Sequence, residues 1–83
     1  MQKLNDVFLA AKEYYYRYPY SNHVCNFEKI AKAADVEIND LELYLNTLKG
    51  MGMVRYSMGL DKYLFLTGYG AWTKNITEES KER

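Results

Sequence analysis

The hydrophobic period of the sequence changes at Gly50 and Gly52, and this change restricts the possible folds more than any other feature. Before these glycines, apolar residues recur with helical spacing. After them, the segments 53–57 and 62–67 are rich in β-branched and aromatic residues and flank the short connector MGLD. The sequence therefore predicts helices followed by a β-hairpin. Because 83 residues suffice for one core, we expect a single α+β, mostly helical domain over 1–83 with its core at about 4–76.

The first predicted helix begins near Leu4 and ends before Pro19, because proline disfavours helical geometry in the preceding residue. Its apolar stripe includes tyrosines from the run EYYYRYPY. Three of them continue the stripe, so we expect them to be core residues, whereas Tyr16 and Tyr20 are candidates for an external contact. The predicted stripe consists of Leu4, Val7, Phe8, Ala11, Tyr14, Tyr15 and Tyr18.

Two further helices are predicted from caps and spacing. Asn26 suits the N-cap of the second helix, and Asn39 is expected to cap the third. Gly50 and Gly52 stop the third helix. The predicted inward residues are Phe27, Ile30, Ala31 and Ala34 in the second helix, and Leu41, Tyr44, Leu45, Leu48 and Met51 in the third.

The C-terminal part predicts one more short helix. Tyr69, Trp72 and Ile76 are spaced i, i+3 and i+7, which would place a last helical turn or two against the body. Residues 77–83 are highly charged, and we expect this tail to fray.

Composition excludes several classes of protein. The 11 basic residues are balanced by 11 acidic ones, so any basic surface must be local. No apolar run reaches 18 residues and charges interrupt the N-terminal segment, so we expect no membrane span, no signal peptide and a cytoplasmic location. Cys25 is the only cysteine, which prevents an internal disulfide. His23 and Cys25 lack a second pair at metal-ligand spacing. We therefore expect no metal, no cofactor and no enzymatic activity.

The run FEKIAKAADVEINDLELYLNTLKGMGMVRYSMGLDKYLFLT resembles winged-helix domains of bacterial and archaeal regulators, such as the MarR and PadR types. The resemblance covers about 45 of the 83 residues. It implies a three-helix core, a two-stranded β-hairpin wing and a C-terminal helix, with the third helix in the DNA major groove. The matching residues are Ile30 and Ala31, then Leu41, Leu45 and Leu48, then Gly52, Met53 and Val54, then Leu66, Thr67 and Gly70.

This resemblance implies a transcriptional regulator that binds double-stranded DNA. A homodimer is expected, because one short domain makes few base contacts. The predicted DNA-binding residues are Lys29, Lys32, Asn39, Asn46, Thr47, Lys49, Arg55 and Lys62. The predicted dimer or partner surface consists of Leu9, Tyr16, Tyr20, Trp72 and Ile76.

Two other binding roles follow from the residues. Residues 35–49 contain four acidic residues and the single basic residue Lys49, and this negative charge opposes DNA binding. The other interpretation is that Asp40 and Glu42 stabilise the N-terminus of the third helix through its dipole. The alternative is therefore a protein-interaction adaptor whose third helix and Met58–Leu60 tip face a protein. A tyrosine platform for single-stranded bases would require outward rings interleaved with Arg or Lys, and only Lys12 and Arg17 are nearby in the sequence.

Overall fold

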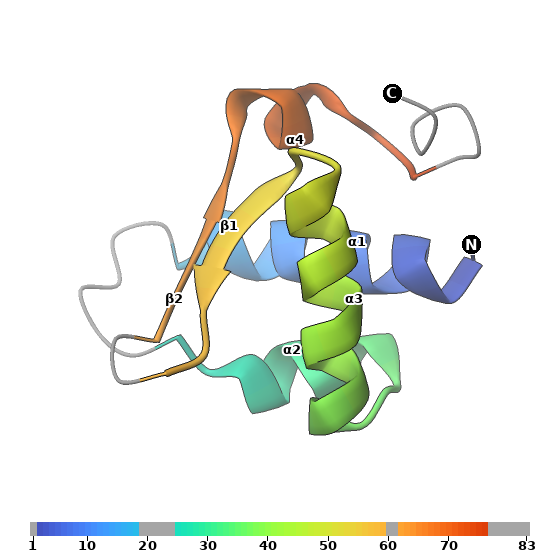
Figure 1. Cartoon of the computed structure of the whole chain (residues 1–83), viewed down its shortest axis with the longest axis vertical. Coiled ribbons are helices and arrows are strands. Elements are labelled where there is room, and N and C mark those ends of the chain that lie inside the picture. Colours follow the sequence, from blue (N-terminus) through green and yellow to red (C-terminus); the bar gives the residue numbers. More distant parts are fainter. Residues whose placement is uncertain (1, 19–24, 60–61, 77–83) are drawn as a thin grey trace.

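The computed structural model describes residues 2–18, 25–59 and 62–76 of the chain, which form four helices and two strands (Figure 1). This arrangement is α+β and mostly helical, and it confirms the predicted order of helices followed by a hairpin. The elements are α1 (Gln2–Arg17), α2 (Phe27–Ala34), α3 (Ile38–Gly50), β1 (Val54–Ser57), β2 (Tyr63–Leu66) and α4 (Gly68–Trp72).

Strands β1 and β2 form an antiparallel hairpin with two different faces. Val54 pairs with Leu66, and Arg55 pairs with Phe65. Side chains alternate between the faces of a strand, and Val54 is buried whereas Arg55 and Phe65 are exposed. The hairpin thus has an inner face that packs on the helices and an outer face that is open to solvent.

One core cluster joins α1, α2 and α3 to the inner face of the hairpin. Helix α3 runs beside the hairpin, and α1 crosses behind both (Figure 1). The predicted inward leucines of α3 are completely buried, each contributing roughly 1.5–3 kcal/mol to stability. The largest fully buried side chains are Val7, Phe8, Ile30, Leu41, Leu45, Leu48, Met53 and Val54.

The boundaries of α1 and α2 agree with the sequence prediction. Helix α1 ends at Arg17, before Pro19. Asn26 caps α2, because its side-chain oxygen accepts a hydrogen bond from the backbone N–H of Lys29 at 3.3 Å. This bond satisfies one of the N–H groups that a helix N-terminus leaves without an internal partner.

The predicted cap of α3 is wrong by two residues. Helix α3 begins at Ile38, so Glu37 takes the N-cap position and Asn39 already lies inside the first turn. The reason is the tight end of α2, where Asp35 adopts a left-handed conformation with φ 57° and the N–H of Val36 bonds back to α2. The chain therefore enters α3 earlier than the polar sequence suggested.

Two glycines shape the region where α3 passes into β1, one within the connection and one in α4. Gly52 has φ +79°, a conformation that side chains disfavour, and it confirms the predicted reversal of the chain. Gly70 lies against the backbone of Met53. The Thr67 hydroxyl links these parts, since its oxygen accepts the N–H of Gly70 at 2.9 Å and lies 3.1 Å from the carbonyl oxygen of Met53.

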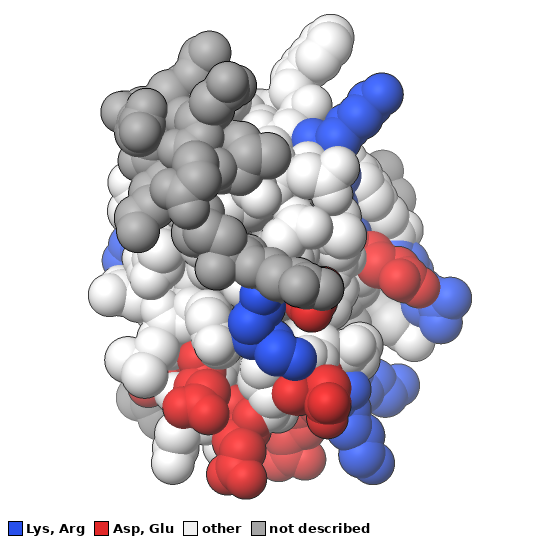
Figure 2. Space-filling model, turned by 90° about the vertical axis from the view of Figure 1, so that its right-hand side faces the viewer, with Lys and Arg blue, Asp and Glu red and all other residues white. Residues whose placement is uncertain are grey.

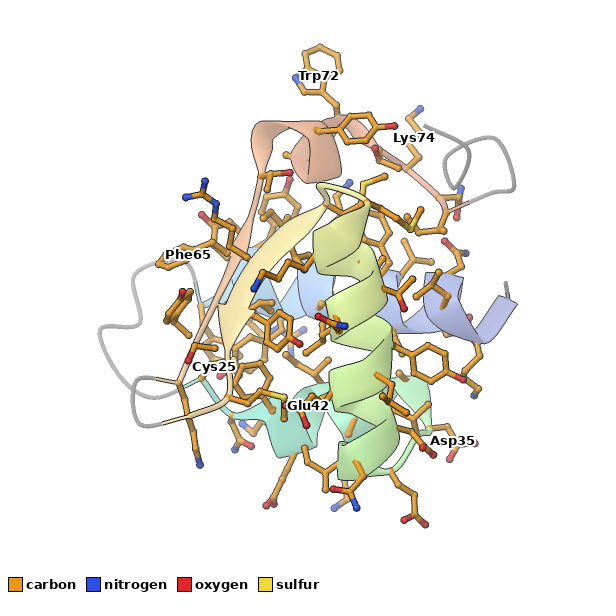
Figure 3. All side chains as sticks on the ribbon, viewed as in Figure 1. Cys25, Asp35, Glu42, Phe65, Trp72 and Lys74 are labelled. Carbon is orange, nitrogen blue, oxygen red and sulfur yellow. The ribbon has the colours of Figure 1, made fainter. Side chains whose placement is uncertain are left out.

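The C-terminal helix is shorter than the spacing predicted. Helix α4 ends at Trp72, and the chain is extended from Thr73 onward. Trp72 is 88% exposed and points away from the body (Figure 3), so the expectation that it packs inward is wrong. Ile76 is buried because the extended chain returns to α1, where the Ile76 N–H donates to the side-chain oxygen of Asn5 at 2.7 Å. The expected fraying of 77–83 concerns residues outside the described ranges.

The tyrosines at the end of α1 are only partly core residues. Tyr14 and Tyr15 are half-buried, which agrees in part with the predicted stripe. Tyr18 is exposed, so the core prediction is wrong for it. Tyr18 follows the last residue of α1, and its ring packs on Tyr14, with the centroids 4.9 Å apart, rather than on the core.

Candidate functional site

The side of α3 opposite its buried leucines is exposed. Asn39, Leu43 and Asn46 lie along this side with helical spacing, and Thr47 and Lys49 flank it. Leu43 is 67% exposed, although an apolar side chain gains by burial. The outward direction of the predicted α3 positions is confirmed, whereas their contact with DNA stays a prediction.

Acidic side chains gather at the end of the molecule where α2 passes into α3. Asp35, Glu37, Asp40 and Glu42 are all exposed. Figure 3 places the labelled Asp35 and Glu42 at the lower end of the view, and Figure 2 shows acidic side chains concentrated at that end of the face it displays. Because duplex DNA is a dense array of negative charges, contact at this end requires compensation by nearby lysines.

Two of the predicted DNA-binding lysines lie on α2 beside α1. Lys29 and Lys32 are exposed and line a groove of about 350 Å³ between α1 and α2, together with Arg17 and Glu13. Arg17 forms an exposed ion pair with Glu13 at 3.6 Å. The two lysines are therefore the cations that α2 offers to an anionic partner in this groove.

Lys49 occupies a different place, at the junction of α3 and β1. Its ammonium nitrogen lies 5.8 Å from the ring centroid of Tyr56. The Tyr56 hydroxyl lies 3.5 Å from the backbone oxygen of Glu42, so the ring bridges the strand and the helix. Burial, together with the nearby Glu42 carboxylate, raises the pKa of Tyr56, which keeps the phenol neutral beside the lysine.

A groove of about 500 Å³ joins the end of the hairpin to the starts of α2 and α3. Lys62 and Met58 from the hairpin, Glu28 from α2 and Ile38 from α3 line it. A partner that contacts the hairpin end therefore also reaches the start of α3. Of the predicted Met58–Leu60 tip, Met58 lines this groove, whereas Leu60 lies outside the described residues.

Arg55 lies apart from the other predicted DNA-binding cations. It is exposed on the outer face of the hairpin, opposite Phe65, whereas Tyr56 beside Lys49 belongs to the inner face. The predicted cations thus occupy the α1–α2 groove, the α3–β1 junction and two places on the hairpin. Lys29 and Lys32 also line a second groove, which shares Glu28 and Ile38 with the groove that contains Lys62. Arg55 lies on the outer face of the hairpin.

The predicted dimer or partner surface is confirmed as exposed at three positions. Leu9, Tyr16 and Trp72 are exposed, and Tyr16 has 54% of its surface accessible. The prediction for Ile76 is wrong, because this side chain is buried where the extended chain meets α1. Tyr20 lies outside the described residues.

An aromatic face on the outside of the hairpin was not predicted. It consists of Tyr63 and Phe65 from β2 with Tyr15 and Tyr16 from α1. The ring centroid of Phe65 lies 5.4 Å from that of Tyr63 and 6.3 Å from that of Tyr15. The alternation in KYLFLT was the available signal, since it puts the two aromatic residues on one face and the two leucines on the other.

The described residues contain neither a metal-binding cluster nor a membrane-spanning helix. Cys25 is buried, and His23 lies outside the described ranges. Within those ranges, no three His, Cys, Asp or Glu side chains come together in a way that could hold a metal ion. None of the described helices combines the length and the apolar character needed to cross a membrane.

Comparisons of the chain with models of protein families, with curated proteins and with solved structures found no match. The functional interpretation therefore depends on the surface of this chain itself.

Proposed function

We propose that this chain is a small winged-helix domain that binds double-stranded DNA and regulates transcription. In this proposal α1, α2 and α3 form the three-helix core, the β1–β2 hairpin is the wing and α4 closes the domain. Helix α3 would lie in the major groove, with α2 across the phosphate backbone. The observation that carries the proposal is the exposed outer side of α3. It lies next to the groove that Ile38, the first residue of α3, lines together with Met58 and Lys62 of the hairpin.

The exposed polar residues of α3 suit base recognition. The Asn46 amide can form two hydrogen bonds with adenine in the major groove, and Asn39 offers the same chemistry two turns earlier. The Thr47 hydroxyl donates to the backbone oxygen of Leu43 at 3.1 Å, so its methyl group is the part that suits a thymine methyl. The role proposed here is binding alone, without a catalytic step or a cofactor.

The phosphate contacts would come from cations around α3. Lys29 and Lys32 belong to α2, Lys49 ends α3, and Lys62 stands beside the groove at the hairpin end. In a plot of log affinity against log salt concentration, each phosphate that a cation neutralises adds about −0.9 to the slope. Four such contacts would give a slope of roughly −3.6, which is steep enough to measure.

A homodimer is part of this proposal, because two copies of one short domain double the number of base contacts across two half-sites. The exposed Leu9, Tyr16 and Trp72 are the remaining candidates for its surface. Sedimentation of the wild type and of Leu9→Asp tests this point, since a charge in an apolar dimer interface should convert the dimer into a monomer.

The main experiment is a salt titration of binding to a pool of random duplexes. Replacing Lys29 and Lys32 by alanine should make the salt slope shallower by about 1.8, since two phosphate contacts are lost. Asp40→Asn with Glu42→Gln should tighten binding, because two negative charges leave the end of α3 that meets the DNA.

Lys74→Ala is the matched control, because it removes one exposed lysine at the end of the molecule opposite Asp35 (Figure 3). It should leave the slope unchanged if the contact is made through α2 and α3. The DNA-binding proposal would be contradicted if the domain bound no duplex at about 50 mM salt. It would also be contradicted if replacing Lys29 and Lys32 left the salt slope unchanged.

The second candidate function is a winged-helix adaptor that binds a protein. The observation that favours it is Leu43, which is largely exposed at the centre of α3 with Asp40 and Glu42 nearby in the sequence. An apolar anchor surrounded by acids suits a partner with an apolar pocket and a basic rim. In that case Leu43→Ala should abolish binding of the partner, and DNA binding should be absent.

A further inference from the structure

The aromatic face of Tyr15, Tyr16, Tyr63 and Phe65 lies outside the surface proposed for duplex DNA. Phe65 is 49% exposed on the outer side of the hairpin (Figure 3), where its ring lies near Tyr15 of α1. Tyr63 and Tyr16 are also exposed, and Tyr15 is half-buried between them and the body. Several large rings thus remain in water, where apolar surface is unfavourable.

The rings of this face meet at steep angles and are not stacked in parallel. Phe65 meets Tyr15 edge to face at an interplanar angle of 71°, and it is tilted by 42° against Tyr63. Tyr15 and Tyr16 also meet edge to face, at 60°. In an edge-to-face pair the edge of one ring lies against the face of the other. The ring surface that a planar ligand can reach is therefore the exposed part of Tyr63 and Phe65, which are 41% and 49% exposed.

Among the described residues, Arg55 is a cation beside this face. Arg55 is exposed beside the rings, because it pairs directly with Phe65 on the outer side of the hairpin. Glu13, the nearest acidic residue of α1 in the sequence, lines the α1–α2 groove and pairs with Arg17 there. Asp35, at the acidic end of the molecule, lies on the opposite side from Phe65 in Figure 3. The ligand that complements this face is therefore planar and anionic.

From these observations we propose that the aromatic face and Arg55 bind unpaired nucleotides of a single-stranded nucleic acid. Unpaired bases offer the planar surfaces that stack on Tyr63 and Phe65, while a phosphate of the same strand pairs with Arg55. A duplex keeps its bases stacked inside the helix and cannot make these contacts. Such a platform requires outward rings next to a cation. The tyrosine-rich segment of α1 alone does not meet this requirement, whereas Tyr63 and Phe65 of β2 beside Arg55 do.

The test measures fluorescence anisotropy of the full chain with labelled oligothymidylate and oligouridylate of about 15 nucleotides, which separate DNA from RNA as the source of the strand. Tyr63→Ala and Phe65→Ala should each weaken strand binding about 5- to 100-fold. Phe65→Leu should weaken it similarly while keeping an apolar side chain, and Phe65→Tyr should retain it. Arg55→Ala should make the salt slope shallower by about 0.7, and Arg55→Lys should keep it.

Tyr69→Ala is the control variant, because it removes an exposed aromatic ring on α4, outside this face and outside the proposed dimer surface, and should leave strand binding unchanged. Circular dichroism of every variant shows whether the fold is intact. Variants of α3, such as Asn46→Ala, should not affect strand binding, so this proposal and the duplex proposal can fail separately.

Three results would overturn the proposal. The first is folded Tyr63 and Phe65 variants that bind the strand as the wild type does. The second is competition by duplex that equals competition by single strand at the same phosphate concentration, which would show attraction by charge alone. The third is that the wild type is a dimer, Phe65→Leu is a monomer, and neither protein binds the strand. That result would make this face a self-association surface.

Discussion

A single methyl group at Gly70 is expected to disrupt the junction between α4 and the hairpin. A Cβ atom on Gly70 would lie 2.0 Å from the carbonyl oxygen of Met53 and 2.9 Å from its carbonyl carbon. Both are backbone atoms, so no side-chain rotation can relieve the contact. The same oxygen accepts the backbone N–H of Thr67 at 3.0 Å, and a shift of Met53 would disturb this hydrogen bond as well.

The size of the effect follows from these distances. A carbon–oxygen contact of roughly 3.3 Å is tolerated, so the two segments must separate by more than about 1 Å. Overpacking of this kind costs about 1–3 kcal/mol, and a lost hydrogen bond adds about 1 kcal/mol. We expect Gly70→Ala to lower the free energy of unfolding by about 3 kcal/mol. For a domain of this size the Tm should fall by roughly 12 °C or more.

Urea unfolding followed by circular dichroism measures this loss as a lower midpoint with an unchanged m-value. Gly68→Ala is the matched control, because it changes the same helix at a position where a Cβ meets no atom within 4 Å. The control should be neutral or slightly stabilising. Equal stability of the two variants would refute the proposed close contact between α4 and Met53.

Two further predictions concern the start of α2. Asn26→Ala should lower the free energy of unfolding by about 1 kcal/mol, and Asn26→Asp should lower it little, because the Lys29 N–H needs a side-chain oxygen as its acceptor. Thermal unfolding measures both losses, and equal losses would contradict the cap. Burial raises the pKa of Cys25 to about 11 from an ordinary 9.0, although a hydrogen bond with Tyr14 opposes the shift. The folded protein therefore keeps a proton that the unfolded chain releases, so stability is fully present below pH 9 and should fall between pH 9 and about 11. Cys25→Ala should lack this part of the pH dependence, and identical profiles of the two proteins would contradict the burial.

Local spacing was sufficient to predict the interior of each long element. Leu41, Leu45 and Leu48 are buried as their helical period indicated, and Asn26 caps α2 as its residue type indicated. These features depend on neighbours within a few residues, where backbone geometry relates sequence spacing directly to direction in space. The open side of α3 follows from the same geometry.

The C-terminal segment shows where this reasoning fails. The spacing of Trp72 and Ile76 suggested one helical face, but α4 ends at Trp72 and the two side chains separate, one into water and one into the core. Tyr18 is similar, since its place on the helical stripe of α1 did not reveal that it follows the helix end. Periodicity gives a direction only as long as the element continues.

Local patterns along the chain were enough to predict the order of helices and hairpin, the buried leucines of α3 and the reversal at Gly52. The contact of Phe65 with Tyr15, fifty residues earlier in the chain, and the separate surfaces of Arg55 and the α2 lysines are visible only in the folded molecule. The physical reason is that burial depends on local periodicity, whereas a surface is assembled from segments whose relative positions depend on how helices and strands cross in the common core.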